Sequence, residues 1–178
     1  MEMRQALCES IDEMMAENEN IVVIDADLAK PNGTFPLRKK YPERAIDVGI
    51  AEQNMASVAA GMSSYGFIPF ITSFTPFASR RICDQIAISI AYAKQNVKII
   101  GSDPGISAEF NGGTHMSMED IGVLRSIPEL VIYEPVDVAQ FKQALPQIVA
   151  YEGPVYIRMF RKTIDDVFTD ANYKFDLF

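Results

Sequence analysis

Short apolar runs of strand length alternate along this chain with segments whose apolar residues recur every three or four positions. The runs are rich in valine and isoleucine and place apolar residues side by side, which is typical of strands covered on both faces. The predicted strands are Ile21–Ile24, Ala45–Val48, Ile68–Ser73, Val97–Gly101, Leu130–Tyr133 and Val155–Met159. The predicted helices are Met3–Asn18, Glu52–Ser64, Phe77–Lys94, Met118–Ser126 and Val138–Tyr151.

This alternation predicts the fold class. A helix followed by repeated strand and helix units gives an α/β, doubly wound layer with a mostly parallel sheet and helices on both faces. Ligands of such sheets bind beyond the carboxyl ends of the strands. We therefore expect functional residues in the loops 47–52, 73–81 and 102–117, the last of which is long enough to suggest a function.

The length of the chain predicts one domain. It has 178 residues, of which 48% are hydrophobic, and this is enough to bury the core of one ordinary domain. We expect residues 1–160 to form it. Because the sequence turns polar and acidic after Phe160, residues 161–178 are expected to be a linker or loosely held tail towards a C-terminal domain absent from this sequence.

The composition argues against several classes of partner. The formal net charge is −8 and no basic stripe is present, so nucleic acid is not expected. No apolar stretch approaches the roughly 20 residues that cross a bilayer, so no membrane partner is expected. Cys8 and Cys83 lie far apart in the sequence, which predicts neither export nor a metal site and favours the cytoplasm.

The loop 47–52 ends in a carboxylate at the start of a predicted helix. Gly49 turns the chain after a strand and Glu52 follows in the first helical turn. Residues 55–62 are small and apolar, so this helix is expected to be buried and its leading carboxylate to need a partner. On spacing alone, the simpler interpretation is an acid that complements the helix dipole.

The loop 73–81 carries two phenylalanines and two arginines. Phe74 and Phe77 can hold a flat ring at the sheet edge or fill the core beneath the next helix. Arg80 and Arg81 can bind a phosphate or carboxylate, or pair with Asp84 on their own helix.

The loop 102–117 contains the only histidine, His115, after Asn111 and two glycines that permit close approach of backbone to a ligand. A lone histidine is equally compatible with a surface polar group. Residues 25–32, which include Asp27, are interpreted as turn formers and are the weakest signal.

Taken in order, five motifs resemble the pyrimidine-binding domain of transketolases, and the resemblance runs from about Met3 to Phe160. These motifs are Asp25-Ala-Asp-Leu28, Gly49-Ile-Ala-Glu-Gln-Asn-Met55, Gly61, Ser73-Phe74-x-x-Phe77 and Gly113-Thr-His115. The resemblance implies two-carbon ketol transfer between sugars or sugar phosphates with thiamine diphosphate as cofactor.

The resemblance also implies roles for individual residues. Glu52 would hydrogen-bond N1′ of the aminopyrimidine ring and favour its imino tautomer, with Phe74, Phe77 and Ile50 around the ring. Glu52 and His115 are the implied catalytic residues. The implied substrate contacts are Asp27, Arg80, Arg81, Asn111 and His115. Two positions depart from the family pattern, because Asn111 replaces an aspartate and Arg80 replaces a tyrosine, which implies an unusual sugar.

The resemblance further implies a partner chain. The family's Gly-Asp-Gly and asparagine motif for diphosphate and metal is not found in this sequence. We therefore expect a diphosphate-binding N-terminal subunit to share the cofactor and to hold its Mg²⁺ or Ca²⁺, while this chain holds no metal. The expected assembly is a homodimer or heterotetramer.

Three alternatives stay open at this point. One is the β subunit of a 2-oxo acid dehydrogenase or decarboxylase, which uses the same glutamate. Another is a non-catalytic dimerising module of the same fold. The third is a nucleotide-binding domain, which usually carries a glycine-rich phosphate loop after its first strand, unlike residues 25–32 here.

Overall fold

The computed structural model describes residues 1–178 and contains a six-stranded sheet whose paired strands all run parallel. The spatial order is β2-β1-β3-β4-β6-β5. The strands are β1 (Ile21–Asp25), β2 (Ala45–Asp47), β3 (Ile68–Phe74), β4 (Lys98–Ser102), β5 (Val131–Tyr133) and β6 (Val155–Met159). Every predicted strand is present, with its ends shifted by a residue or less.

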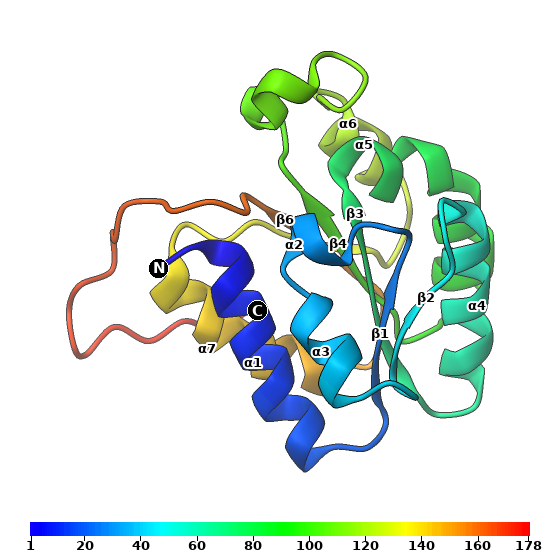
Figure 1. The fold of residues 1–178 in the computed structure, drawn as a ribbon, viewed down its shortest axis with the longest axis horizontal. Helices are drawn as coiled ribbons and strands as arrows, with labels where there is room; N and C mark the ends of the chain where they lie inside the picture. The colour runs from blue at the N-terminus through cyan, green and yellow to red at the C-terminus, as the bar shows by residue number, and fades with distance from the viewer.

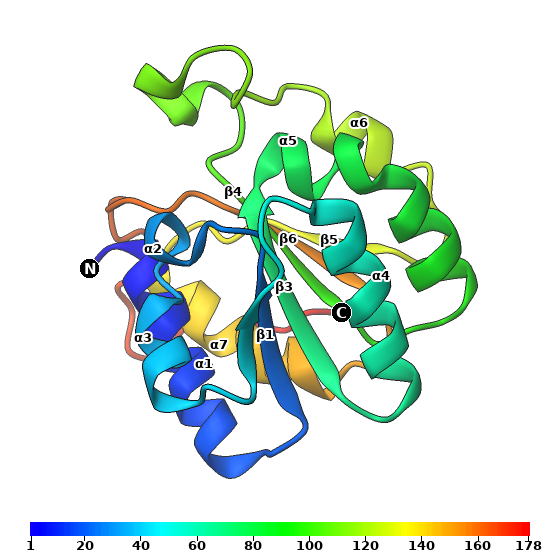
Figure 2. The ribbon, with the colours of Figure 1, turned by 45° about the vertical axis from the view of Figure 1, so that its right-hand side comes forward.

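Helices cover both faces of this sheet (Figures 1 and 2). On one face lie α1 (Met3–Glu17), α3 (Phe35–Lys40) and α7 (Val138–Ala150). On the other lie α4 (Glu52–Ser64), η2 (Gln85–Tyr92) and α6 (Asp120–Leu124). Each layer buries its own apolar cluster against the sheet, so the α/β doubly wound fold class is confirmed.

The predicted helix Phe77–Lys94 is wrong as a single helix. It divides into α5 (Thr75–Ala78), a 3₁₀ turn η1 (Arg80–Ile82) and the π-helix η2. Ser79, at φ −125° and ψ −89°, has a non-helical backbone and separates the first two. Apolar spacing of three or four residues does not distinguish these helix types. Three short elements were not predicted: α2 (Ala29–Asn32), α3 and the 3₁₀ segment η3 (Ile106–Asn111).

The carboxylate of Asp137 connects the start of α7 to the C-terminal segment. Its Oδ1 accepts a hydrogen bond from Gln140 N at 2.8 Å, which caps the helix. Its Oδ2 accepts from the backbone N–H groups of Val167 and Phe168 at 2.9 and 2.7 Å. The N-cap of α7 therefore also anchors the segment after β6.

Two glutamines of α7 bind the backbone of residues 173–177. The side-chain amide of Gln143 donates to Tyr173 O at 3.1 Å and accepts from Phe175 N at 2.9 Å. Gln147 makes the same pair of contacts two residues further along the bound segment: it donates to Phe175 O at 2.9 Å and accepts from Leu177 N at 3.0 Å. The segment expected to be loosely held is thus bound along α7, while the division of the chain at residue 160 stays a prediction.

Lys98 is buried at the amino end of β4, opposite the edge where ligands are expected. Its ammonium donates to the carbonyl oxygens of Tyr151 and Gly153, both at 2.8 Å, and forms no ion pair. Burial lowers the pKa of Lys98 to about 7. None of the helices has the length and apolar character that a bilayer span requires.

Candidate functional site

A cavity of about 250 Å³ lies where the loops after β1, β2, β3 and β4 meet. It contains six of the residues that the sequence singled out as site residues, together with two apolar neighbours. The lining residues are Ala26, Asp27, Leu28, Ile50, Glu52, Phe77, Arg81 and His115. The loops therefore converge at the carboxyl edge of the sheet, as the predicted fold class requires.

Glu52 is the first residue of α4 and is only 4% exposed. Its Oε1 accepts a hydrogen bond from Nη1 of Arg81 at 2.8 Å, so the buried carboxylate has the charged partner that its environment requires. Oε2 forms no hydrogen bond within the chain. The carboxylate therefore keeps one oxygen as an acceptor for a ligand in the cavity.

Phe74, Phe77 and His115 form an aromatic group beside Glu52. The ring centroids of Phe74 and Phe77 lie 5.6 and 5.2 Å from that of His115, in edge-to-face geometry. Phe74 is 4% exposed and fills the end of the core, whereas Phe77 lines the cavity. The guanidinium of Arg81 lies over the Phe77 ring at 3.9 Å. The cavity wall can thus support a flat, polar ring.

The remaining predicted residues lie outside the cavity lining. Arg80 is exposed and pairs with Glu119 at 2.7 Å, and Asn111 is exposed on the loop after β4. Neither arginine pairs with Asp84, the partner that helical spacing predicts. Of the predicted substrate residues, Asp27, Arg81 and His115 line the cavity, whereas Arg80 and Asn111 are exposed outside its lining.

Arg161 also lies at this edge, although the sequence placed it in the expected linker. Its guanidinium is 5.1 Å from the Phe74 ring and its Nε is 2.5 Å from Oδ2 of the buried Asp103. The signal that could have found it is its position directly after β6, whose carboxyl end lies beside that of β4.

Asp25 and Asn32 are not turn residues but members of a fully buried polar network. Asp25 accepts hydrogen bonds from the hydroxyls of Thr34, at 2.8 and 2.9 Å, and Thr72. Asn32 donates to Thr72 at 3.1 Å and accepts from Ser102 Oγ at 2.7 Å. Burial raises the pKa of Asp25 to about 6, although the hydroxyl hydrogen bonds oppose it.

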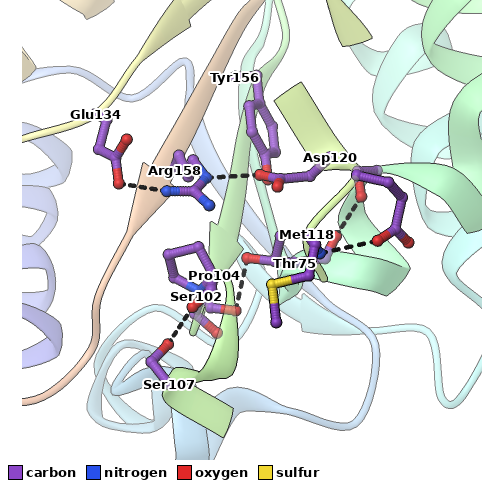
Figure 3. A network of polar contacts seen from close by, with 11 residues as sticks. Thr75, Ser102, Pro104, Ser107, Met118, Asp120, Glu134, Tyr156 and Arg158 are labelled. Carbon is purple, nitrogen blue, oxygen red and sulfur yellow. Dashed lines mark hydrogen bonds and ion pairs between the residues drawn. The ribbon is translucent and has the colours of Figure 1, made fainter. Parts of the chain in front are cut away.

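A second network supports the loop after β4 (Figure 3). Asp120, the first residue of α6, accepts hydrogen bonds from Tyr156 OH at 3.1 Å and Arg158 Nε at 2.8 Å. Arg158 also reaches Glu134 at 2.5 Å. Burial and the charge of Asp120 raise the pKa of the Tyr156 hydroxyl well above its usual value. The network ties α6 to β6 directly after the loop that carries His115.

The loop 103–117 projects from the sheet in Figures 1 and 2 and is closed at its base. Gly105 and Ser117 exchange backbone hydrogen bonds at 2.8 and 3.3 Å. Glu109, with φ 48°, pairs with Lys162 at 2.6 Å. The histidine therefore sits near the end of a loop that is held at two points.

Comparison with known proteins assigns the fold. The profile described as the transketolase pyrimidine binding domain matches residues 1–165. A split-gene transketolase, described as an inactive β4 tetramer, superposes with a TM-score of 0.85 at 39% identity, covering 99% of this chain and 56% of that one. The transketolase of Campylobacter jejuni superposes with a TM-score of 0.82 at 25% identity, covering 96% of this chain and 28% of that one.

Two curated relatives are subunits of transketolases. The 6-deoxy-6-sulfo-D-fructose transketolase subunit of Clostridium sp. (strain MSTE9) is 53% identical over 160 residues, covering 90% of this chain and 50% of the relative. An apulose-4-phosphate transketolase subunit of Phocaeicola vulgatus is 30% identical over 174 residues, covering 98% of this chain and 56% of the relative. The chain thus spans about half the length of these relatives. Through its profile match and its fold, the chain belongs to the transketolase pyrimidine-binding domain family.

Proposed function

We propose that this chain supplies the aminopyrimidine half of a thiamine diphosphate site and acts, with a partner chain, in transketolase-like transfer of a two-carbon ketol unit between sugars. The observation that carries the proposal is the carboxylate of Glu52, buried at the head of α4 beside an aromatic group and facing the cavity. A carboxylate in that position can hold a proton at a ring nitrogen.

The cavity suits the ring that the proposal requires. A volume of about 150 Å³ holds a benzene molecule in an apolar protein cavity, and this cavity measures about 250 Å³. Glu52 Oε2 offers a hydrogen-bond acceptor, Phe77 offers an aromatic side chain and Ile50 adds an exposed apolar side chain to the lining. These are the groups that a polar, flat heterocycle needs for recognition.

Each residue has a defined task in the proposed mechanism. Glu52 would hold the proton at N1′ of the aminopyrimidine, and Phe77, which lines the cavity, would orient the ring. Phe74, buried with its ring centroid 6.4 Å from that of Phe77, would support Phe77 and keep water from that side. When bound, thiamine diphosphate supplies the electron sink for cleaving the carbon–carbon bond next to a ketose carbonyl. His115, which lies 5.2 Å from the Phe77 ring, donates to or accepts from a hydroxyl of the sugar.

The proposed substrate is a small sugar with an anionic end. The named substrates of the two relatives carry a sulfonate and a phosphate. Asp27 and Arg81 line the cavity, and Arg80 and Asn111 are exposed on the segments after β3 and β4. Both arginine side chains are more than 40% exposed although each pairs with a glutamate, so an anionic group could share them.

The proposed partner is a diphosphate-binding subunit that also carries Mg²⁺ or Ca²⁺. Large apolar side chains stand exposed at the cavity mouth and on the projecting loop, where a second chain would bury them. They are Ile50, Ile106, Phe110 and Met118. We propose a heterotetramer or homodimer; the split-gene transketolase is described as an inactive tetramer of β subunits, which supports self-association of chains with this fold. The proposed location is the cytoplasm, which would keep Cys8 and Cys83 as free thiols.

Substitution of Glu52 tests the proposed function. Glu52→Gln removes the proton exchange but keeps the size of the side chain, so ketol transfer by the complex with the partner chain should fall by about 100-fold or more. Glu13→Gln, on the exposed surface of α1, is the matched control and should retain full activity. The proposal fails if the Glu52→Gln complex transfers ketol units at a rate close to that of the wild type.

A comparison of substrates distinguishes the proposed transketolase activity from that of a 2-oxo acid dehydrogenase. A ketose and aldose pair should be turned over by the wild-type complex, whereas a 2-oxo acid with a lipoyl acceptor should not. The relatives named above favour the first result. A non-catalytic module has no need for a buried, ion-paired carboxylate in a cavity, so the state of Glu52 disfavours that alternative.

A further inference from the structure

Asp47 connects two loops of the site without lining the cavity itself. It is the last residue of β2 and its side chain is 13% exposed. Its Oδ1 accepts hydrogen bonds from the backbone N–H of Asp27 at 3.1 Å and of Gly49 at 2.7 Å. One carboxylate oxygen therefore binds the loop after β1 and the loop after β2 at the same time.

Both donors have an unusual backbone conformation. Asp27 has φ 59° and Gly49 has φ 75°, both in the left-handed region. This region is unfavourable for a residue with a Cβ atom such as Asp27. A hydrogen bond to a charged acceptor is stronger than one to a neutral group, so Asp47 can stabilise this conformation.

The other carboxylate oxygen is held from α3. Oδ2 of Asp47 accepts from Nη1 of Arg38 at 2.9 Å. Arg38 comes from α3, whereas the two donors to Oδ1 come from the loops after β1 and β2, so the carboxylate is held from three segments. The ion pair with Arg38 thus adds to the hydrogen bonds that fix the orientation of the carboxylate.

The two loops held by Asp47 carry cavity residues on both sides. Ala26, Asp27 and Leu28 come from the first loop, whereas Ile50 and Glu52 follow Gly49 in the second. We infer that Asp47 is a positioning residue for the site: its carboxylate sets the distance between the two loops and thereby the place of Glu52 relative to the opposite wall. This inference rests on the proposed function.

Two substitutions separate geometry from charge. Asp47→Asn keeps an acceptor oxygen at the same distance from the backbone but loses the charge. Asp47→Glu keeps the charge and lengthens the side chain, which displaces the acceptor. Asp12→Ala, which removes an exposed ion pair between α1 and Lys40 at the end of α3, is the control.

The first measurement is the affinity of the complex for thiamine diphosphate, with the partner chain present. Loss of a hydrogen bond to a charged group corresponds to about 10- to 100-fold in an equilibrium constant, so Asp47→Glu, which displaces the acceptor of both loops, should weaken the affinity by about 10- to 100-fold. Asp47→Asn should bind several times more tightly than Asp47→Glu, and Asp12→Ala should match the wild type. Wild-type affinity in Asp47→Glu, or a greater loss in Asp47→Asn, overturns the inference.

The second measurement needs neither cofactor nor partner. In nuclear magnetic resonance spectra of the 178-residue chain, the amide protons of Asp27 and Gly49 should both move upfield in Asp47→Glu, and should move in the same direction by a smaller amount in Asp47→Asn, which keeps the acceptor but loses its charge. Unchanged amide resonances in Asp47→Glu overturn the coupling of the loops. If the wild-type complex shows no dependence on thiamine diphosphate, the proposed function fails, while these resonances still decide whether Asp47 couples the loops.

Discussion

Glu52 and Arg81 form an asymmetric ion pair, because the side chain of Glu52 is 5% exposed and that of Arg81 is 43% exposed. Solvent screens the arginine, so the pair itself contributes less than a fully buried one. The larger cost of breaking it is that the glutamate would remain buried without a partner. We predict that Arg81→Met lowers the free energy of unfolding by about 1 to 2 kcal/mol.

Arg80 provides the matched control for this prediction. Its partner Glu119 is 38% exposed, so water can replace the arginine. Arg80→Met should change the free energy of unfolding by less than about 0.5 kcal/mol. Urea unfolding of both variants measures the difference, and equal effects would contradict the asymmetry described for Glu52.

The lowered pKa of Lys98 gives a prediction for how the free energy of unfolding changes with pH. Its pKa is about 7 in the folded chain and 10.5 as the ordinary value, so between these values the unfolded chain binds more protons. The free energy of unfolding should therefore rise with pH from 7 to 9, by up to about 1.4 kcal/mol per pH unit. Lys98→Met should remove this rise.

The control for the pH series is Lys142→Met, since Lys142 is exposed on α7 and pairs only with Glu9. Chemical unfolding at pH 7, 8 and 9 would measure the slopes. A slope in Lys98→Met equal to that of the wild type would show that Lys98 is not the group responsible.

At the scale of residues, the sequence predicted which side chains matter better than it predicted their partners. Glu52 needs a partner wherever its helix is buried, and that expectation follows from composition alone. The partner is Arg81, 29 positions away, and its identity depends on how η1 turns after Ser79. Asp25 was misjudged for the same reason, because its burial depends on Thr34 and Thr72 folding over it.

At the scale of elements, strands were predicted more accurately than helices. A strand covered on both faces needs a continuous apolar run, and β1, with all five residues buried, has one. Helix type leaves no such mark, so the π-helix η2 was taken for an α-helix. The short helices α2 and α3, which were not predicted, contain Pro31 and Pro36, and proline is more typical of turns than of helices.

The contact of β4 with β6 gives a prediction at this scale. A Cβ atom added at Gly101 would clash with the hydroxyl of Tyr156, the group that binds Asp120. Gly101→Ala should therefore lower the free energy of unfolding by about 1 to 3 kcal/mol, because the tightly packed strand must shift. Differential scanning calorimetry measures the change.

Gly61 of α4 is the control for Gly101, since no atom lies within 4 Å of its added Cβ. Alanine is a better helix former than glycine, so Gly61→Ala should raise stability by about 0.5 to 1 kcal/mol. A destabilising Gly61→Ala together with a neutral Gly101→Ala would contradict the packing described for the two elements.

At the scale of the whole molecule, the segment after β6 returns across one face and closes the sheet's apolar layer. Tyr133 packs against Phe175 with ring centroids 5.5 Å apart, and Leu177 lies against the same cluster. The double variant Gln143→Leu, Gln147→Leu removes four hydrogen bonds from α7 to the backbone of residues 173–177 and keeps the one from Gln140 to the Tyr173 hydroxyl. Hydrogen exchange at Phe175 and Leu177 should become much faster.

Exchange in the strands of the sheet should remain slow in this double variant, because α7 keeps its apolar contacts with α1. Gln5→Leu, on the exposed side of α1, is the control and should leave exchange at Phe175 unchanged. Slow exchange at Phe175 and Leu177 in the double variant would contradict the prediction, because it would show that the segment stays bound without the glutamine hydrogen bonds.

The two glutamines recognise peptide groups, and every residue type except proline offers the same donor and acceptor. The route of residues 173–177 is therefore encoded in α7, while the identity of most side chains along that route is left open. In a saturation library selected for the bound C-terminal segment, nearly any amino acid should be accepted at the exposed positions Lys174 and Asp176. Most replacements of Gln143 and Gln147 should release the segment.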